Sequence, residues 1–173
     1  MIWWLKLEGT SGSQAIFSKD RGDSEVNGNS DENVWEYHIN GGNPELKIWN
    51  KEGGAWESQQ TASAYITDTN WYFLAFSTYY DGSNMTVKHY YNAGNAESFT
   101  YSDLVYVLDR RSWTNTSQFW MGSARSTDGS DPSVETPING GFIYSVKIYQ
   151  EEVTNATFNP FIKTNRADCY GNC

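Results

Sequence analysis

The chain has few of the residues that mark several common protein classes. It contains two cysteines, four prolines and two histidines, and its 12 lysines and arginines are outnumbered by 21 aspartates and glutamates. The formal net charge is -9, so the chain lacks the basic surface that attracts nucleic-acid phosphates or anionic membranes. We therefore expect no nucleic-acid partner, whereas acidic loops could hold a divalent cation.

The two cysteines are too few and too close together to hold the fold. Cys169 and Cys173 both lie at the C-terminal end, outside every segment with a core pattern. They can close only a very small disulfide loop, and no further Cys or His pair completes a zinc site. The sequence therefore predicts one domain over residues 1–165, followed at 166–173 by the start of a truncated cysteine-rich segment.

Long hydrophobic runs are also missing. No apolar stretch approaches the length needed to span a bilayer, and the first residues are strand-like instead of having the basic and apolar regions of a signal peptide. The chain is then either intracellular or one domain of a larger protein. Glycosylation sequons at Asn84, Asn115 and Asn155 are compatible with an extracellular or cell-surface domain, which is the location that we expect, with no membrane insertion by this domain.

Aromatic residues are abundant, with 8 Trp, 12 Tyr and 8 Phe. Two runs rich in aromatic and β-branched residues, 71–80 and 85–92, flank the dipeptide Asp81-Gly82. Asp-Gly allows the positive backbone angles of a tight hairpin turn, and the flanking residues favour a pleated, half-buried state. The sequence therefore predicts a β-hairpin here.

Further strands recur at short intervals, and no segment has a convincing helical period. We expect them at 2–7, 15–18, 34–39, 45–49, 96–101, 104–108, 118–121 and 142–149, with a tail around 158–162. Strands this aromatic must bury one face, which predicts two facing sheets. The predicted core is Trp4, Ile16, Trp35, Tyr37, Leu46, Ile48, Trp71, Phe73, Ala75, Val87, Phe119, Met121, Ile143, Val146 and Ile148.

The order of these pieces resembles the laminin-G-like, concanavalin A-like lectin/glucanase superfamily. The resemblance rests on the run from Trp71, the Asp81-Gly82 turn, the strand ending at Asn92, the segment Trp120-Met121-Gly122 and the strand 141–149. It covers nearly the whole chain and implies an all-β fold, a two-sheet antiparallel jelly-roll sandwich. These signals mark a fold and not a reaction.

The same fold occurs in glucanases and lyases, so catalysis needs separate consideration. Jelly-roll glucanases carry a Glu-x-Asp-x-Glu pattern on one strand, and this chain has none. Glu32 and Glu36 are four residues apart, and His38 and His89 are isolated in sequence. We therefore expect a chain that is not an enzyme, with a polysaccharide-active enzyme kept as an alternative.

The resemblance also implies a calcium site at one rim of the sandwich. In laminin-G-like domains acidic side chains from two loops hold the ion, and these positions correspond here to Asn50 and to Asp128 or Asp131. Asn supplies a neutral oxygen, so binding at Asn50 would be weaker than at an Asp. Calcium is the expected cofactor.

Tryptophans in loop-like contexts are candidate sugar-stacking residues. Trp56 follows Gly53-Gly54, and Trp113 follows Arg110-Arg111. An exposed indole ring can stack on the apolar face of a pyranose, although a loop Trp can also cover the end of a sandwich.

Together these patterns predict a non-catalytic recognition or adhesion module of a larger surface or secreted protein. Its rim loops would bind a glycan or an extracellular protein partner, assisted by calcium. A purely structural spacer or assembly domain is the other alternative to this interpretation.

Overall fold

The computed structural model is all-β over the part of the chain that it describes. These residues are 1–19, 35–50, 55–61, 64–80, 85–93, 100–106, 119–122, 124–125, 134–135 and 138–148, and they contain no helix. The strands are β1 (Ile2–Leu7), β2 (Ser13–Lys19), β3 (Trp35–Asn40), β4 (Asn43–Asn50), β5 (Ala55–Gln60), β6 (Tyr72–Tyr80), β7 (Met85–Ala93), β8 (Thr100–Tyr106), β9 (Phe119–Met121), β10 (Ala124–Arg125), β11 (Val134–Glu135) and β12 (Gly141–Lys147).

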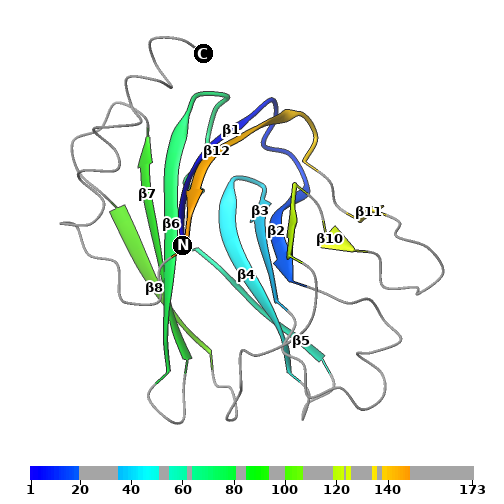
Figure 1. The fold of residues 1–173 in the computed structure, drawn as a ribbon. Helices are drawn as coiled ribbons and strands as arrows, with labels where there is room; N and C mark the ends of the chain where they lie inside the picture. The colour runs from blue at the N-terminus through cyan, green and yellow to red at the C-terminus, as the bar shows by residue number, and fades with distance from the viewer. Residues whose placement is uncertain are drawn as a thin grey trace.

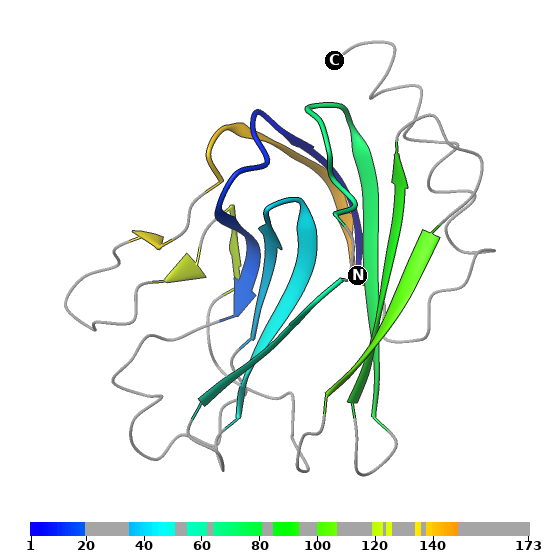
Figure 2. The ribbon, with the colours of Figure 1, turned by 180° about the vertical axis from the view of Figure 1, so that it is seen from behind.

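The strands form two antiparallel five-stranded sheets. Sheet A has the order β12-β1-β6-β7-β8 and sheet B the order β5-β4-β3-β2-β9, while β10 and β11 pair by themselves. Figures 1 and 2 show the two layers facing each other, with β1 and β12 arching over the end of sheet B. Each sheet combines strands from distant parts of the sequence, as in a jelly roll. The predicted fold class is therefore confirmed.

The predicted hairpin is present as β6 and β7. These strands pair in continuous antiparallel register from Tyr72 opposite Ala93 to Tyr80 opposite Met85. The turn residues 81–84 lie outside the described part of the chain. β7 continues the sheet by pairing with β8. The sequence predicts two short strands here, at 96–101 and 104–108, whereas the structure has the single strand β8.

Aromatic rings join the two sheets at the centre of the core. Trp3 of β1 contacts Phe17 and Tyr37 of sheet B edge-to-face, with ring centroids 4.9 Å apart in both pairs. Tyr37 stacks on Phe76 of β6 at 5.0 Å. Edge-to-face and offset-stacked pairs add about 0.5–1.5 kcal/mol each beyond the area that they bury, so this cluster fixes how sheet A lies on sheet B.

The predicted core is correct on β2, β3 and β4 of sheet B and at Val87 on β7 of sheet A, and it lies on the wrong face of β1 and β6. Tyr37, Leu46 and Ile48 belong to the buried cluster as expected. On β1 and β6, however, the cluster contains Trp3, Leu5, Leu7, Tyr72, Leu74 and Phe76. The predicted residues Trp4 and Phe73 are fully buried, yet they pair with each other in register on the opposite face. Trp71 and Ala75 are likewise buried outside the inter-sheet cluster.

The physical reason is the two-residue period of a strand. A shift of one residue exchanges the two faces, and here both faces of β1 and β6 carry large apolar residues, so alternation could not select one. Of the other predicted core residues, Phe119, Met121 and Ile148 are exposed by 41%, 59% and 68%. Trp35, Ile143 and Val146 are partly buried against the core.

Strand β5 was not expected from the sequence. Its second half reads Ser-Gln-Gln and has no apolar alternation, so no strand signal is visible. The structure pairs it with β4 from Glu45 opposite Gln60 to Asn50 opposite Ala55. Backbone hydrogen bonds to β4 hold β5 in the sheet, although its side chains have little preference for a strand. The predicted tail strand at 158–162 lies outside the described residues.

Candidate functional site on the outer face of sheet B

Sheet B has one apolar and one polar surface. Tyr37, Ile39 and Leu46 belong to the core, so the residues that alternate with them face away from sheet A. Strand register brings the polar residues of four strands together on this outer surface. We call this set the polar face: Ser13, Glu36, His38, Asn40, Glu45, Lys47, Ser58 and Gln60.

His38 lies at the centre of the first group on the polar face. Its Nδ1 atom is 2.9 Å from the hydroxyl oxygen of Ser13. Its Nε2 atom is 2.8 Å from a carboxylate oxygen of Glu36, two residues earlier on the same strand. Both ring nitrogens therefore have partners, which fixes the plane of the imidazole.

Glu45 organises the second group, on the neighbouring strand. In register it lies directly opposite His38. The Asn40 side-chain amide donates a hydrogen bond to Oε2 of Glu45 over 3.3 Å, and the Ser58 hydroxyl donates to Oε1. Three strands thus contribute to one carboxylate.

These groups are more buried than the surface of a sheet requires. His38 is 1% exposed, Glu45 5% and Glu36 7%. Removing ionisable groups from water is costly unless hydrogen bonds replace the lost hydration, and each of the three has such bonds here. A set of buried, mutually bonded polar groups outside the hydrophobic core is a candidate recognition surface.

A two-glycine turn places this hairpin. Asn40 and Asn43 pair across Gly41 and Gly42, which both have positive φ, 57° and 82°, as a tight hairpin turn requires. The Gly42 carbonyl accepts hydrogen bonds from the backbone N–H groups of Tyr65 (2.9 Å) and Ile66 (3.0 Å). The Gly41 N–H donates to the carbonyl of Gly12, beside Ser13, over 2.9 Å. The turn therefore holds β2, β3 and β4 in fixed positions around His38.

The residues predicted to bind a ligand fall only partly within the described structure. Trp56 lies in strand β5 and not in a loop. Its backbone pairs with Trp49, two residues along each strand from the Lys47–Ser58 pair. Its side chain lies outside the described part of the structure. Trp113 also lies outside it.

The predicted calcium ligands are likewise only partly described. Asn50 ends β4 and pairs with Ala55, and Asp128 and Asp131 lie outside the described residues. Where side chains are described, no group of three or more His, Cys, Asp or Glu residues is placed to hold a metal ion.

Sequence reasoning missed the grouping of Glu36, His38 and Glu45. The alternation in residues 34–39 already places Glu36 and His38 on one face, for which the pattern predicts contact with water, whereas in the structure the two residues are buried. A turn centred on Gly41-Gly42 then puts Glu45 opposite His38, so the two glycines were the signal that could have found the cluster.

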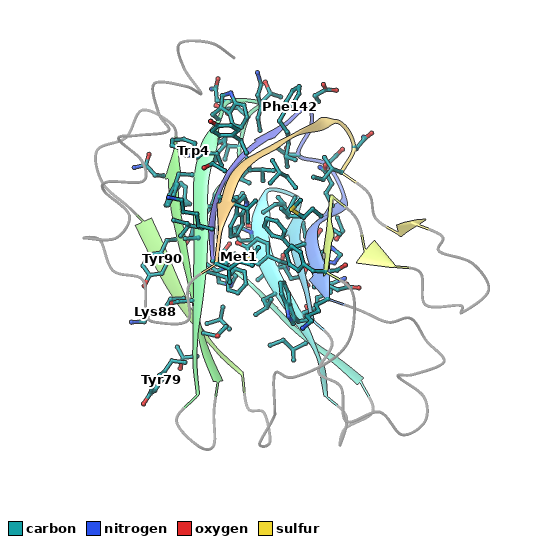
Figure 3. All side chains as sticks on the ribbon, viewed as in Figure 1. Met1, Trp4, Tyr79, Lys88, Tyr90 and Phe142 are labelled. Atoms are coloured by element: carbon teal, nitrogen blue, oxygen red, sulfur yellow. The ribbon has the colours of Figure 1, made fainter. Side chains whose placement is uncertain are left out.

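The outer face of sheet A has a different character. Trp71 lies 6.3 Å from Phe142 and 6.5 Å from Tyr144, measured between ring centroids, and the two β12 rings are 58% and 38% exposed. Figure 3 shows Tyr79, Lys88 and Tyr90 projecting from this sheet on the side away from sheet B. This surface is aromatic, whereas the polar face offers hydrogen-bonding groups.

Within the described ranges no helix has the length and apolar character to cross a membrane.

Comparison with known proteins supports the fold. No protein-family model and no curated protein sequence matches the chain. Three similar solved structures are CBM40 of the Ruminococcus gnavus IT-sialidase: bound to alpha2,3 sialyllactose (TM-score 0.58, 14% identity), without a named ligand (0.55, 14%) and bound to alpha2,6 sialyllactose (0.55, 13%). Each alignment covers 94% of this chain and 79% of the other. At this identity the likeness establishes a shared jelly-roll sandwich.

Proposed function

We propose that this chain is a non-catalytic carbohydrate-binding module and that its polar face contacts the sugar. The observation that carries the proposal is the network of Ser13, His38, Glu36, Asn40, Glu45 and Ser58 on one sheet surface. Sugar hydroxyls are both donors and acceptors, and a site with fixed carboxylate, amide and hydroxyl groups suits them. The shared fold with a CBM40 that binds sialyllactose supports this choice.

The polar face favours binding over cleavage of a glycosidic bond. Glycosidases use two carboxyl groups that act on the bond from opposite sides. Glu36 is held by His38, and Glu45 is held by Asn40 and Ser58. Both carboxylates are already engaged and nearly inaccessible, which leaves neither available to protonate a leaving group.

Trp56 would supply an aromatic ring beside the polar face. Support for this choice comes from its backbone position on β5, two residues from Ser58 and opposite Trp49. Aromatic pairs contribute about 0.5–1.5 kcal/mol beyond the area that they bury, and we expect a similar contribution from an indole ring on a sugar face. Loss of Trp56 would therefore weaken sugar binding without changing the fold.

A glycan array with isothermal titration of the hits tests the proposal. The probes are lactose, alpha2,3 and alpha2,6 sialyllactose, and neutral polysaccharide fragments. Glu45→Gln keeps the size of the side chain and removes the charge that holds the Asn40 amide and the Ser58 hydroxyl. Hydrogen bonds to charged groups contribute about 1.5–3 kcal/mol, so these two groups should lose their fixed positions, and we expect sugar binding about tenfold weaker.

Phe142→Ala on the outer face of sheet A is the matched control and should leave binding unchanged. Loss of binding in Phe142→Ala with retention in Glu45→Gln would move the site to sheet A. If the wild-type chain binds no glycan on the array and no protein in a screen of extracellular proteins, a structural spacer would be favoured.

The calcium and location expectations remain part of the proposal. Asn50, Asp128 and Asp131 offer oxygen donors of the kind that calcium prefers, so we expect chelation by EDTA to weaken glycan binding. Unchanged binding after chelation would remove calcium from the proposal. Placement in a surface or secreted protein follows from the glycan ligand and would be checked by finding sugars on Asn84, Asn115 or Asn155 by mass spectrometry.

A further inference from the structure

The bonding of His38 determines which of its nitrogens carries the proton. An ionised Glu36 can only accept hydrogen bonds, so the neutral imidazole must donate from Nε2 to the carboxylate. The lone pair of Nδ1 is then left to accept the hydroxyl proton of Ser13 across 2.9 Å. Ser13, His38 and Glu36 thus form a nucleophile, a base and a group that orients the base, which we call the triad.

Exposure distinguishes Ser13 from the other two members of the triad. Ser13 is half-buried, whereas His38 and Glu36 are 1% and 7% exposed. Ser13 is therefore the one member of the triad that is not buried, while its base and carboxylate are shielded from water. The backbone at Ser13 is fixed as well, because Gly12 has a positive φ of 72° and its carbonyl accepts the Gly41 N–H.

We propose that the triad makes Ser13 a nucleophile toward acyl esters. This proposal goes beyond glycan binding: the chain would be non-catalytic toward glycosidic bonds only, and a sugar on the polar face would compete with an ester for Ser13. Its test uses an ester and no sugar, so it does not depend on the glycan proposal. It also differs from glycosidic cleavage, since the bond broken is an ester C–O bond and no pair of free carboxyl groups is needed.

The proposed reaction is acyl transfer in two balanced steps. As the Ser13 oxygen bonds to the ester carbonyl carbon, its proton passes to Nδ1 of His38, and that proton then goes to the alcohol that leaves. Water next attacks the acyl-serine with His38 taking its proton, the carboxylic acid leaves, and Ser13 regains its hydrogen. Glu36 is a positioning residue: it fixes the imidazole and stabilises the imidazolium formed in each step.

Ser58, Ser18 and Ser77 differ from Ser13. The Ser58 hydroxyl donates to a carboxylate, and Ser18 is fully buried. Ser77 on β6 is half-buried like Ser13, but its register neighbour is Lys88, which cannot accept a proton while charged. Ser77→Ala is therefore a matched control.

A fluorophosphonate probe tests the proposal directly. The serine oxygen displaces fluoride at phosphorus, the serine proton leaves as hydrogen fluoride, and the stable adduct is located by mass spectrometry of the intact and digested chain. We expect an adduct on Ser13 in the wild type, none in Ser13→Ala, and an unchanged adduct in Ser77→Ala. In His38→Gln we expect labelling about 100-fold slower, since general base catalysis contributes about 10²–10⁴.

Glu36→Gln separates positioning from simple structural support. His38 faces Glu36 on its own strand, Glu45 on β4 and the uncharged Ser13 and Ala15 on β2. Removing the Glu36 charge destabilises the imidazolium, so the pH profile of labelling should move to lower pH. A role confined to folding would leave the profile in place, and circular dichroism with a melting curve shows which variants remain folded.

Hydrolysis of p-nitrophenyl acetate completes the experiment, with loss in Ser13→Ala expected. The proposal is wrong if the folded wild type gives no Ser13 adduct, or if His38→Gln, shown to be folded, labels as fast as the wild type. Because no sugar is used, either failure leaves the glycan proposal to its own test.

Discussion

His89 is a polar side chain enclosed in the core. It is fully buried on β7, its Nδ1 lies 3.2 Å from the hydroxyl of Tyr37 on the opposite sheet, and its Nε2 has no partner among the described residues. Phe76 lies beside it in register on β6. Burial lowers the pKa of His89 from 6.5 to about 4, because the apolar surroundings disfavour the charged form.

This lowered pKa makes the fold sensitive to acid. Between pH 6.5 and pH 4 the unfolded chain takes up a proton at His89 and the folded chain does not. The contribution of His89 to the free energy of unfolding is therefore fully present above pH 6.5 and is lost as the pH falls toward 4. The full loss is about 3 kcal/mol. Urea unfolding at pH 7.0, 5.5 and 4.5 measures it.

His89→Leu is the control for that measurement. Leu cannot titrate, so the slope of stability against pH over this range should become shallower in the variant. An equal slope in both proteins would contradict the assignment. A second transition overlaps the upper end of this range, since burial lowers the pKa of the Met1 amine from 8.0 to about 6 and the linked loss of stability continues from pH 7 down to about 6. That contribution is the same in both proteins and cancels in the comparison.

Trp3 and Tyr79 provide a test of which face is the core. Trp3 is fully buried against Phe17 and Tyr37, whereas Tyr79 is 70% exposed. We expect Trp3→Ala to lower the free energy of unfolding by about 3–5 kcal/mol and Tyr79→Ala to change it by no more than about 0.5 kcal/mol. Similar losses in the two variants, measured by denaturant unfolding, would show that the inter-sheet core is misplaced.

At the level of elements, the β3–β4 hairpin carries most of the polar face, and its turn can be tested with two adjacent glycines. Gly41 and Gly42 both have positive φ, but a Cβ atom at Gly41 would meet open space, whereas one at Gly42 would collide with the backbone carbonyl of Ile66. Gly41→Ala should cost about 1 kcal/mol, the price of a left-handed conformation.

Gly42→Ala should cost clearly more, because the turn or the segment at Ile66 must also move. Since the same turn positions Asn40 and Glu45, glycan binding should fall in Gly42→Ala and survive in Gly41→Ala. Thermal unfolding and titration of the two variants give both readouts. Equal behaviour of the two would mean that the turn does not hold the polar face.

The strands show what a sequence can and cannot specify. β3 and the β6–β7 hairpin were predictable, because their alternation or their turn dipeptide is visible in the residues themselves. The face of β1 was not, since Trp3 and Trp4 are chemically alike and only tertiary packing separates them. Strand β5 was hidden because most of its residues are polar. The position of Glu45 opposite His38 follows from the turn at Gly41-Gly42, whereas the hydrogen bond from Ser58 to Glu45 was hidden because it needs strand β5.

At the level of the whole molecule, charge bears on which sugars can bind. The chain has a net charge of -9, and the polar face carries two carboxylates, Glu36 and Glu45, against the single ammonium group of Lys47. Like charges repel, and the repulsion extends over a Debye length of about 10 Å at 0.1 M salt. An acidic sugar therefore approaches this face against the field of the protein.

We accordingly expect the polar face to prefer neutral glycans, in contrast to the sialyllactose named for the similar CBM40 structures. Titration of lactose and alpha2,3 sialyllactose at 20 and 300 mM salt tests this preference. Lactose affinity should be insensitive to salt, and any sialyllactose affinity should rise severalfold at high salt because screening weakens repulsion. Sialyllactose binding that is tighter than lactose binding and weakens with salt would instead show that a cationic group, outside the polar face as defined, contacts the sugar carboxylate.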